Sequence, residues 1–195
     1  MDTAWTSGTR HLAQIVLDHL QIRRSAAKTV HAMNLEIPAG HVLALIGPEK
    51  SGKTSLLLAM SRMLSSQDPL ASIEGHVWVD QEDMLDDQTD ERQVRRYMGF
   101  ISAATPPFPI SIFDNIAFGL RLMGRKDPAY IRWAVEEHLR QVDLWDIVRG
   151  KLHREAHTLP LGLQRRLCIA RTLAVEPKVL LLDDLTAGLD PVAVA

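Results

Sequence analysis

The segment 47–54, GPEKSGKT, constrains this chain more than any other part of it. It matches the pattern GxxxxGK[ST], in which successive backbone N–H groups converge on phosphate oxygens. The apolar run 41–46 precedes it and the Leu- and Met-rich stretch 55–64 follows it, which predicts a buried strand before the loop and a helix after it. A chance match is the competing interpretation, but the strand–loop–helix context favours a site for nucleotide phosphates.

The loop residues have separate chemical tasks in such a site. The Lys53 ammonium can bridge the β- and γ-phosphates, the Thr54 hydroxyl can ligate Mg²⁺, and Gly52 lets the backbone approach the phosphates closely. The positive end of the following helix adds to the attraction of the anion. The residues expected to surround the nucleotide are Gly47, Pro48, Glu49, Lys50, Ser51, Gly52, Lys53, Thr54 and Ser55.

A second apolar run, 179–182, ends in Asp183 and Asp184. Many buried strands end in Asp, so this feature is weak alone, but together with the phosphate loop it predicts a magnesium-holding carboxylate. We expect Asp183 to hold Mg²⁺ through water and Asp184 to orient or activate the attacking water. The candidate catalytic residues are therefore Asp184 and Lys53, and the candidate metal residues are Thr54 and Asp183.

Hydrophobic periodicity divides the rest of the chain into strands and helices. Short apolar alternation over 15–37, 73–79 and 97–102 predicts strands. Apolar residues spaced for one helical face predict helices over 111–123 and 128–142, and 161–174 is a third helix candidate. The pattern predicts an α/β nucleotide-binding core with a helical insertion.

Charge and cysteine content exclude several classes of protein. Lys and Arg number 22 against 24 Asp and Glu, a net charge of −2, so no basic field argues for nucleic-acid binding. The single cysteine, Cys168, permits no internal disulfide and is expected to be a buried thiol. The N-terminus is polar, without the apolar core of a leader, and the longest aliphatic runs are far shorter than the roughly 20 residues of a membrane helix.

From about Ile15 to Pro191 the chain resembles the ATP-binding subunits of ABC transporters, most closely the phosphate-importer ATPases. The stretches that carry the resemblance are NLEIPAG (34–40), ALIGPEKSGKTSLL (44–57), PFPISIFDNIAFGLRLMG (107–124), LWDIVRGKLH (144–153) and QRRLCIARTLAVEPKVLLLDD (164–184). The resemblance implies an ATP- and Mg²⁺-binding subunit that couples hydrolysis to phosphate uptake. It also implies a homo- or heterodimer of such subunits, bound to membrane permease subunits at the inner face of the cell membrane.

The same resemblance implies an α/β P-loop NTPase fold with an antiparallel β portion and a helical subdomain. Residues 1–195 would form one nucleotide-binding domain, with 1–104 and 176–195 as its α/β core and 105–175 as its helical subdomain. The family's D-loop aligns with 188–190 and ends at Asp190. Its switch histidine should follow, and the sequence stops at Ala195 before that position, so we expect a C-terminally truncated domain.

Several positions depart from the family pattern. The signature LSGGQ, whose serine and glycines grip the γ-phosphate bound to the opposite subunit, aligns with a remnant in which only Gly162 survives of those three gripping residues: Leu159, Pro160, Leu161, Gly162 and Leu163. Pro160 supplies neither the serine hydroxyl nor an N–H group, and Leu161 puts bulk where backbone must approach phosphate.

Other departures affect the chemistry and the base. The Q-loop glutamine aligns with Ala103, and the catalytic glutamate aligns with Asp184, whose carboxylate is retracted by one methylene. The aromatic residue that stacks on adenine aligns near Arg23 or Arg24, where an arginine plane could stack instead. Lys50 replaces a loop glycine, so it is either strained or an extra phosphate contact.

Two functions follow from these observations. The first is an energy-coupling ATPase subunit of an ABC importer for phosphate. The alternative is a degenerate nucleotide-binding module with little or no ATPase activity, regulatory or vestigial. A truncated product without a role of its own comes third, and a small kinase is distant because the PFPISIFDN and LCIAR stretches have no place in one.

Overall fold

The computed structural model describes residues 14–24 and 27–187. Their contacts divide the chain into two compact units. The unit that we call the sheet unit contains the described residues 14–100 and 178–181, and the helical unit contains 101–177 and 182–187.

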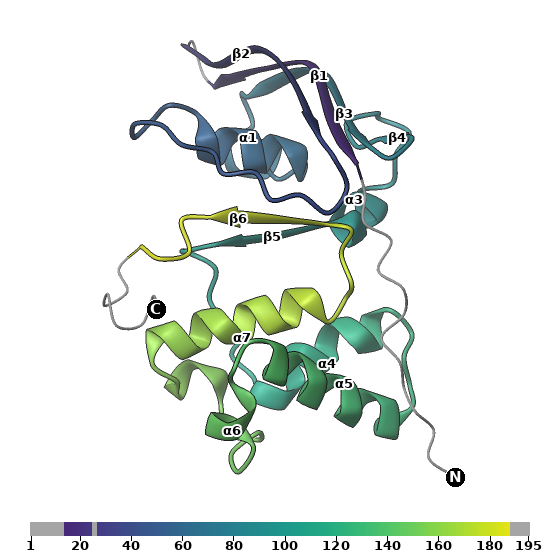
Figure 1. The fold of residues 1–195 in the computed structure, drawn as a ribbon, viewed down its shortest axis with the longest axis vertical. Helices are drawn as coiled ribbons and strands as arrows, with labels where there is room; N and C mark the ends of the chain where they lie inside the picture. The colour runs from purple at the N-terminus through teal and green to yellow at the C-terminus, as the bar shows by residue number, and fades with distance from the viewer. Residues whose placement is uncertain (1–13, 25–26, 188–195) are drawn as a thin grey trace. The chain divides into compact units, whose positions relative to one another are not determined.

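An antiparallel sheet forms one side of the sheet unit, with the strand order β2-β1-β3-β4 (Figure 1). These strands are β1 (Ile15–Arg24), β2 (Ala27–Ile37), β3 (Ser72–Val79) and β4 (Glu82–Asp83). In the register, Leu17 of β1 lies opposite Leu35 of β2 and Val77 of β3. Alternate side chains of β1 are buried, as expected when one face of a sheet covers a core.

A bulge interrupts the pairing of β1 with β3 between Asp18 and Gln21. His19 has a φ of 49° there, and Gly75 on the opposite strand has a φ of 95°. A Cβ on Gly75 would lie 2.5 Å from the His19 carbonyl oxygen, so this close approach requires glycine.

Helix α1 (Lys53–Met60) packs its Leu and Met side chains against the sheet, and Leu58 and Ala59 are fully buried in this core. The unit also contains α2 (Leu64–Gln67) and α3 (Glu91–Tyr97). Helix α3 was not predicted. Its N-cap Asp90 accepts a hydrogen bond from the Arg92 N–H group, a local interaction that starts a helix without a long apolar stripe.

Strands β5 (Met98–Ser102) and β6 (Val179–Asp183) pair with each other as a two-stranded sheet. Figure 1 shows their arrows running in the same direction. Both strands were predicted. However, β6 was expected to be a buried strand, and its Leu180 and Leu182 are 37% and 47% exposed.

The strand predicted over 41–46 was wrong. No strand is assigned there, and Val42 and Ile46 are 99% and 94% exposed. A strand buried on both faces needs a hydrogen-bonding neighbour along its edges. Among the described strands, β1 to β4 pair with one another and β5 pairs with β6, so none supplies that ladder. The aliphatic composition of 41–46 is typical of a central strand, but no strand in the described part of the chain pairs with it.

The helical unit packs five helical segments around a second core, in which Ile112, Ile116 and Leu139 are fully buried. The segments are α4 (Ile112–Leu122), α5 (Pro128–Gln141), α6 (Trp145–Val148), the 3₁₀ turn η1 (Ala156–Thr158) and α7 (Leu161–Leu173). The helices predicted over 111–123, 128–142 and 161–174 are confirmed as α4, α5 and α7. Ser111 and Asp127 cap the first two, each accepting a hydrogen bond from an N–H group of the first turn.

Together the two units confirm the predicted mixed α/β class with an antiparallel portion and a helical part. No helix within the described ranges is both long and apolar enough to cross a lipid bilayer.

Candidate functional site

The phosphate loop leads directly into α1, which begins at Lys53. Gly52 is the N-cap with a φ of 99°, and its carbonyl accepts the first helical hydrogen bond, 2.8 Å from the Leu56 nitrogen. The Lys53 Nζ donates to the carbonyl oxygens of Gly47 at 2.9 Å and Pro48 at 2.8 Å. The loop therefore wraps around the ammonium group on which the predicted phosphate contact depends.

Most of the loop is open to solvent. Residues 47–51 are exposed, Gly52 is buried, and Ser55 is buried beneath the loop on the inner side of α1. Ser51 closes a turn by donating its N–H to the Pro48 carbonyl at 3.3 Å. An exposed loop at the start of a helix, with a lysine held over it, can accept an anion on its N–H groups.

Lys50 adopts the left-handed conformation, with a φ of 61°. This is the condition under which the sequence predicted strain, which costs an L residue with a side chain about 1–2 kcal/mol. The side chain is exposed, so it could reach an anion bound to the loop.

Thr54 and Asp183 fit Mg²⁺ by their chemistry, since hydroxyl and carboxylate oxygens are the hard donors that this ion prefers. Thr54 lies in the first turn of α1, in the sheet unit, and Asp183 ends β6, in the helical unit. Within the described residues, no group of three or more His, Cys, Asp or Glu side chains could hold a metal ion by itself.

The structure brings Ala103 and Asp183 together. The Ala103 N–H donates to the Asp183 carbonyl at 3.0 Å, so the Q-loop position lies beside the end of β6. The Ala103 methyl group can neither donate nor accept a hydrogen bond there. Asp184 follows with a φ of 51° in a turn that the Ala187 N–H closes on the Asp184 carbonyl at 3.0 Å.

Arg165 on α7 fixes the loop that carries Asp184. Its guanidinium is buried and donates to the carbonyl oxygens of Leu185 and Ala187, while its Nε has no partner within the described chain. Sequence reasoning did not single out Arg165, because its partners are backbone groups about twenty residues away. The sequence signal that could have indicated Arg165 is its place, as a charged residue, on the buried side of α7.

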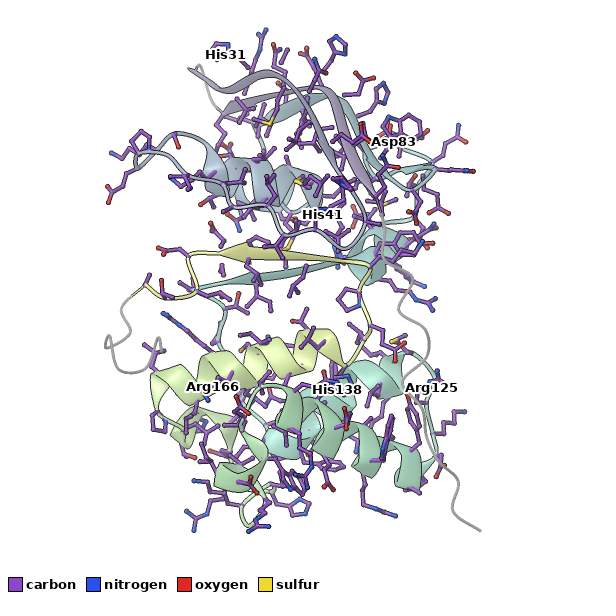
Figure 2. The ribbon with its side chains drawn as sticks, viewed as in Figure 1. His31, His41, Asp83, Arg125, His138 and Arg166 are labelled. Atoms are coloured by element: carbon purple, nitrogen blue, oxygen red, sulfur yellow. The ribbon has the colours of Figure 1, made fainter. Side chains whose placement is uncertain are left out.

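The signature remnant forms the start of α7. Pro160 is the N-cap and provides no side-chain cap, Leu159 is buried, and Leu161 is 49% exposed. Gly162 and Leu163 follow in the first turn, and Figure 2 places Arg166 farther along the same helix. The Gln164 side-chain amide donates to the Leu159 carbonyl at 2.6 Å. A side chain of α7 therefore holds the residue that precedes the N-cap of this helix.

The loop before α4 is held by a buried amide. Asn115 accepts a hydrogen bond from the Phe108 N–H at 2.8 Å, and its Nδ2 donates to the Phe108 and Ser111 carbonyls. This network holds Phe108 beside Phe118, and Phe108 is 39% exposed. The Arg171 guanidinium lies 4.1 Å from the centre of the Phe108 ring. Asn115 was not predicted, although it lies in the PFPISIFDN stretch.

Three further positions can be placed. Cys168 is buried, as predicted, and burial raises the pKa of its thiol. Arg24 pairs with Asp68 at 3.1 Å, whereas Arg23 is exposed, so Arg23 is the more accessible of the two candidates for stacking on adenine. Asp190 and the rest of the D-loop position lie outside the described residues.

Comparison with known proteins agrees with the sequence resemblance. A family described as ABC transporter matches residues 30–187. The phosphate import ATP-binding protein PstB 1 of Streptococcus agalactiae is 38% identical over 174 residues, which is 89% of this chain and 69% of that protein. PstB of Thermotoga maritima is 41% identical over 164 residues, 84% of this chain and 65% of that protein.

Two solved structures share the fold. Part of a bacterial Atm1-family ABC exporter with ATP bound has a TM-score of 0.76 at 21% identity, covering 98% of this chain and 33% of that one. CbiO1 of Clostridium perfringens, part of the ABC transporter complex cbiONQ, has a TM-score of 0.75 at 26% identity, covering 92% of this chain and 68% of that one.

Proposed function

The chain belongs to the ABC transporter family, and from that premise we propose that it is the ATP-binding subunit of an ABC importer for phosphate. The observation that carries the proposal is the phosphate loop, with Lys53 held by two loop carbonyls at the start of α1. When ATP binds, its β- and γ-phosphates replace those carbonyls as partners of the Lys53 ammonium.

The division of labour follows from the residues present. Mg²⁺, held by Thr54 and through water by Asp183, would neutralise charge on the β- and γ-phosphates. Asp184 would orient the attacking water, and Arg165 would fix the loop from which Asp184 extends. We assign residues 1–195 to one nucleotide-binding domain that contains both units.

The partners belong to the same proposal. We place the chain at the inner face of the cell membrane, bound to permease subunits and paired with a second ATP-binding subunit. Phe108, exposed beside Phe118 and ordered through Asn115, offers an apolar edge for a permease segment.

Specific observations also favour the alternative of a degenerate module with slow turnover. Pro160 and Leu161 stand where the helix start should present a hydroxyl and bare backbone to the γ-phosphate. Ala103 lies beside the end of β6, and its side chain has no polar group. We therefore propose that ATP binding is retained and that the chain's own hydrolysis is very slow.

Steady-state ATPase activity of the purified chain tests the proposal that ATP is bound but hydrolysed very slowly. We compare the wild type with the triple variant Ala103→Gln, Pro160→Ser and Leu161→Gly, each with and without Lys53→Ala. The triple variant should hydrolyse ATP at least tenfold faster, because a single restored transition-state donor contributes about 100-fold or more in other enzymes. Lys53→Ala should abolish the gain. A wild type that already turns over ATP rapidly through Lys53 would contradict the slow-turnover proposal and leave the importer function standing.

A further inference from the structure

A basic loop in the helical unit lines a cavity that is open to solvent and that the proposed function does not use. It connects α6 to η1, and the cavity has a volume of about 320 Å³. Six consecutive residues line it: Arg149, Gly150, Lys151, Leu152, His153 and Arg154. A phosphate group with several water molecules fits a space of this size, since each water occupies about 30 Å³ of liquid volume.

The lining carries three fixed positive charges within six residues, on a chain whose net charge is −2. Only Arg149 has an ion-pair partner, Asp146, and its Nε lies 3.9 Å from that carboxylate, which is long. Within the part of the chain that the structure describes, Lys151 and Arg154 have no ion-pair partner. The neighbouring acid, Glu155, is paired with His157 at 3.1 Å instead.

The backbone of this loop is fixed before any ligand arrives. The Arg154 N–H donates to the Lys151 carbonyl at 2.9 Å, which closes a turn over the lining residues. The carbonyls of Leu152 and Arg154 each accept a hydrogen bond, at 2.9 Å, from the first two N–H groups of α4. These two carbonyls are therefore hydrogen-bonded to α4. Because the loop is already ordered, it loses little conformational entropy when it binds a ligand.

We propose that this loop binds a phosphate group. Arginine guanidinium groups match phosphate oxygens in bidentate geometry, and a lysine and a histidine beside them add charge and a further donor. The ligand is either a free phosphate ion or the phosphate headgroup of a membrane lipid, which present the same oxygens. The proposal does not depend on nucleotide binding, because all six lining residues belong to the helical unit and the 47–54 loop belongs to the sheet unit.

The first arm of the test titrates inorganic phosphate into the full chain at constant ionic strength and follows backbone amides by NMR. The Gly150 and His153 amides should shift and saturate in the wild type and in Lys53→Ala. In the triple variant Arg149→Gln, Lys151→Gln and Arg154→Gln the affinity should fall at least tenfold. A control triple variant that removes the same charge from exposed residues, Arg92→Gln, Arg96→Gln and Lys126→Gln, should change the affinity less than twofold.

The second arm measures co-sedimentation with phosphatidylcholine vesicles, with and without phosphatidic acid. Selective binding to the acidic vesicles, lost in the loop variant only, assigns the site to a lipid headgroup, whereas saturable binding of the free ion alone assigns it to phosphate. If neither probe binds, or if the control variant loses as much affinity as the loop variant, the proposal is wrong. Equal competition by polyglutamate would likewise overturn it, since that would show unspecific attraction of anions. The proposed ATP site can succeed or fail independently, because its test is nucleotide binding in the 47–54 loop.

Discussion

At the scale of single residues, Lys50 combines a structural cost with a chemical opportunity. Its φ of 61° places a side-chain-bearing residue where glycine is favoured, and its exposed ammonium lies in the loop that we expect to hold the nucleotide. The sequence left strain and phosphate contact as alternatives. The structure supports the strained conformation. The size of the strain can be tested by measuring the free energy of unfolding of a Lys50 variant.

We predict that Lys50→Gly raises the free energy of unfolding by up to about 1 kcal/mol. Relief of about 1–2 kcal/mol of left-handed strain exceeds the roughly 0.5–1 kcal/mol of extra chain entropy that glycine brings to the unfolded state. Urea denaturation followed by circular dichroism measures the change. Lys126→Gly serves as the control, because Lys126 has no positive φ and should gain nothing. A clear loss of stability in Lys50→Gly would show that the side chain makes a stabilising contact.

Residues also show where sequence reasoning stops. The spacing of the loop predicted Lys53 and, conditionally, the strain at Lys50, because both follow from a local pattern. Arg165 and Asn115 were missed because their partners are main-chain carbonyls and amides that the fold brings to them. Such partners leave no residue type in the sequence that could be recognised.

At the scale of elements, periodicity predicted strands and helices well and predicted sheet partners poorly. The three long helices and strands β1, β2, β3, β5 and β6 lie close to their expected positions. The run 41–46 has the composition of a central strand, but strand formation also depends on neighbours that a local pattern does not contain. Val42 and Ile46 are exposed for that reason.

This exposure predicts a contrast between similar substitutions. Val42→Thr and Ile46→Thr should each change the free energy of unfolding by less than about 0.5 kcal/mol, as is usual at the surface. Val77→Thr, at a fully buried position of β3, should cost about 1–3 kcal/mol because it buries a hydroxyl group. Chemical denaturation of the three variants distinguishes them. Equal losses at 42 and 77 would mean that 41–46 is buried in solution.

The pairing of β3 with β4 gives a pH-dependent prediction. Asp83 Oδ1 accepts hydrogen bonds from the Val77 and Leu85 N–H groups, and its Oδ2 lies 2.6 Å from the His76 ring (Figure 2 labels Asp83). This hydrogen bond, and then the charge of the carboxylate, raise the pKa of His76 above its ordinary value. The charged histidine therefore stabilises the folded chain below about pH 6.5, and this contribution is lost as pH rises through the raised pKa.

His76→Gln should accordingly destabilise the chain more at about pH 6 than at about pH 9. Thermal denaturation at the two pH values measures this difference, and His41→Gln is the matched control. His41 is exposed and its ring Nδ1 lies 3.1 Å from the neutral Ala39 carbonyl instead of a carboxylate, so its variant should show no such dependence. A pH-independent effect of His76→Gln would contradict the proposed pairing.

At the scale of the whole molecule, the chain is nearly neutral, and the two anion sites that we propose each depend on a few cations within one short loop. The 47–54 loop carries two lysines and the 149–154 loop carries three fixed cations. The family and the mixed α/β fold follow from sequence and are confirmed. The proposed magnesium site draws Thr54 from the sheet unit and Asp183 from the helical unit.

The central claim is that the 47–54 loop binds MgATP, and calorimetric titration of ATP into the full chain in the presence of Mg²⁺ tests it most directly. We predict saturable one-site binding in the wild type and in the control Lys126→Ala, with affinity at least tenfold weaker in Lys53→Ala, because a hydrogen bond to a charged group contributes about 1.5–3 kcal/mol. Absence of ATP binding by the folded wild type, or equal affinity in Lys53→Ala, would contradict the account.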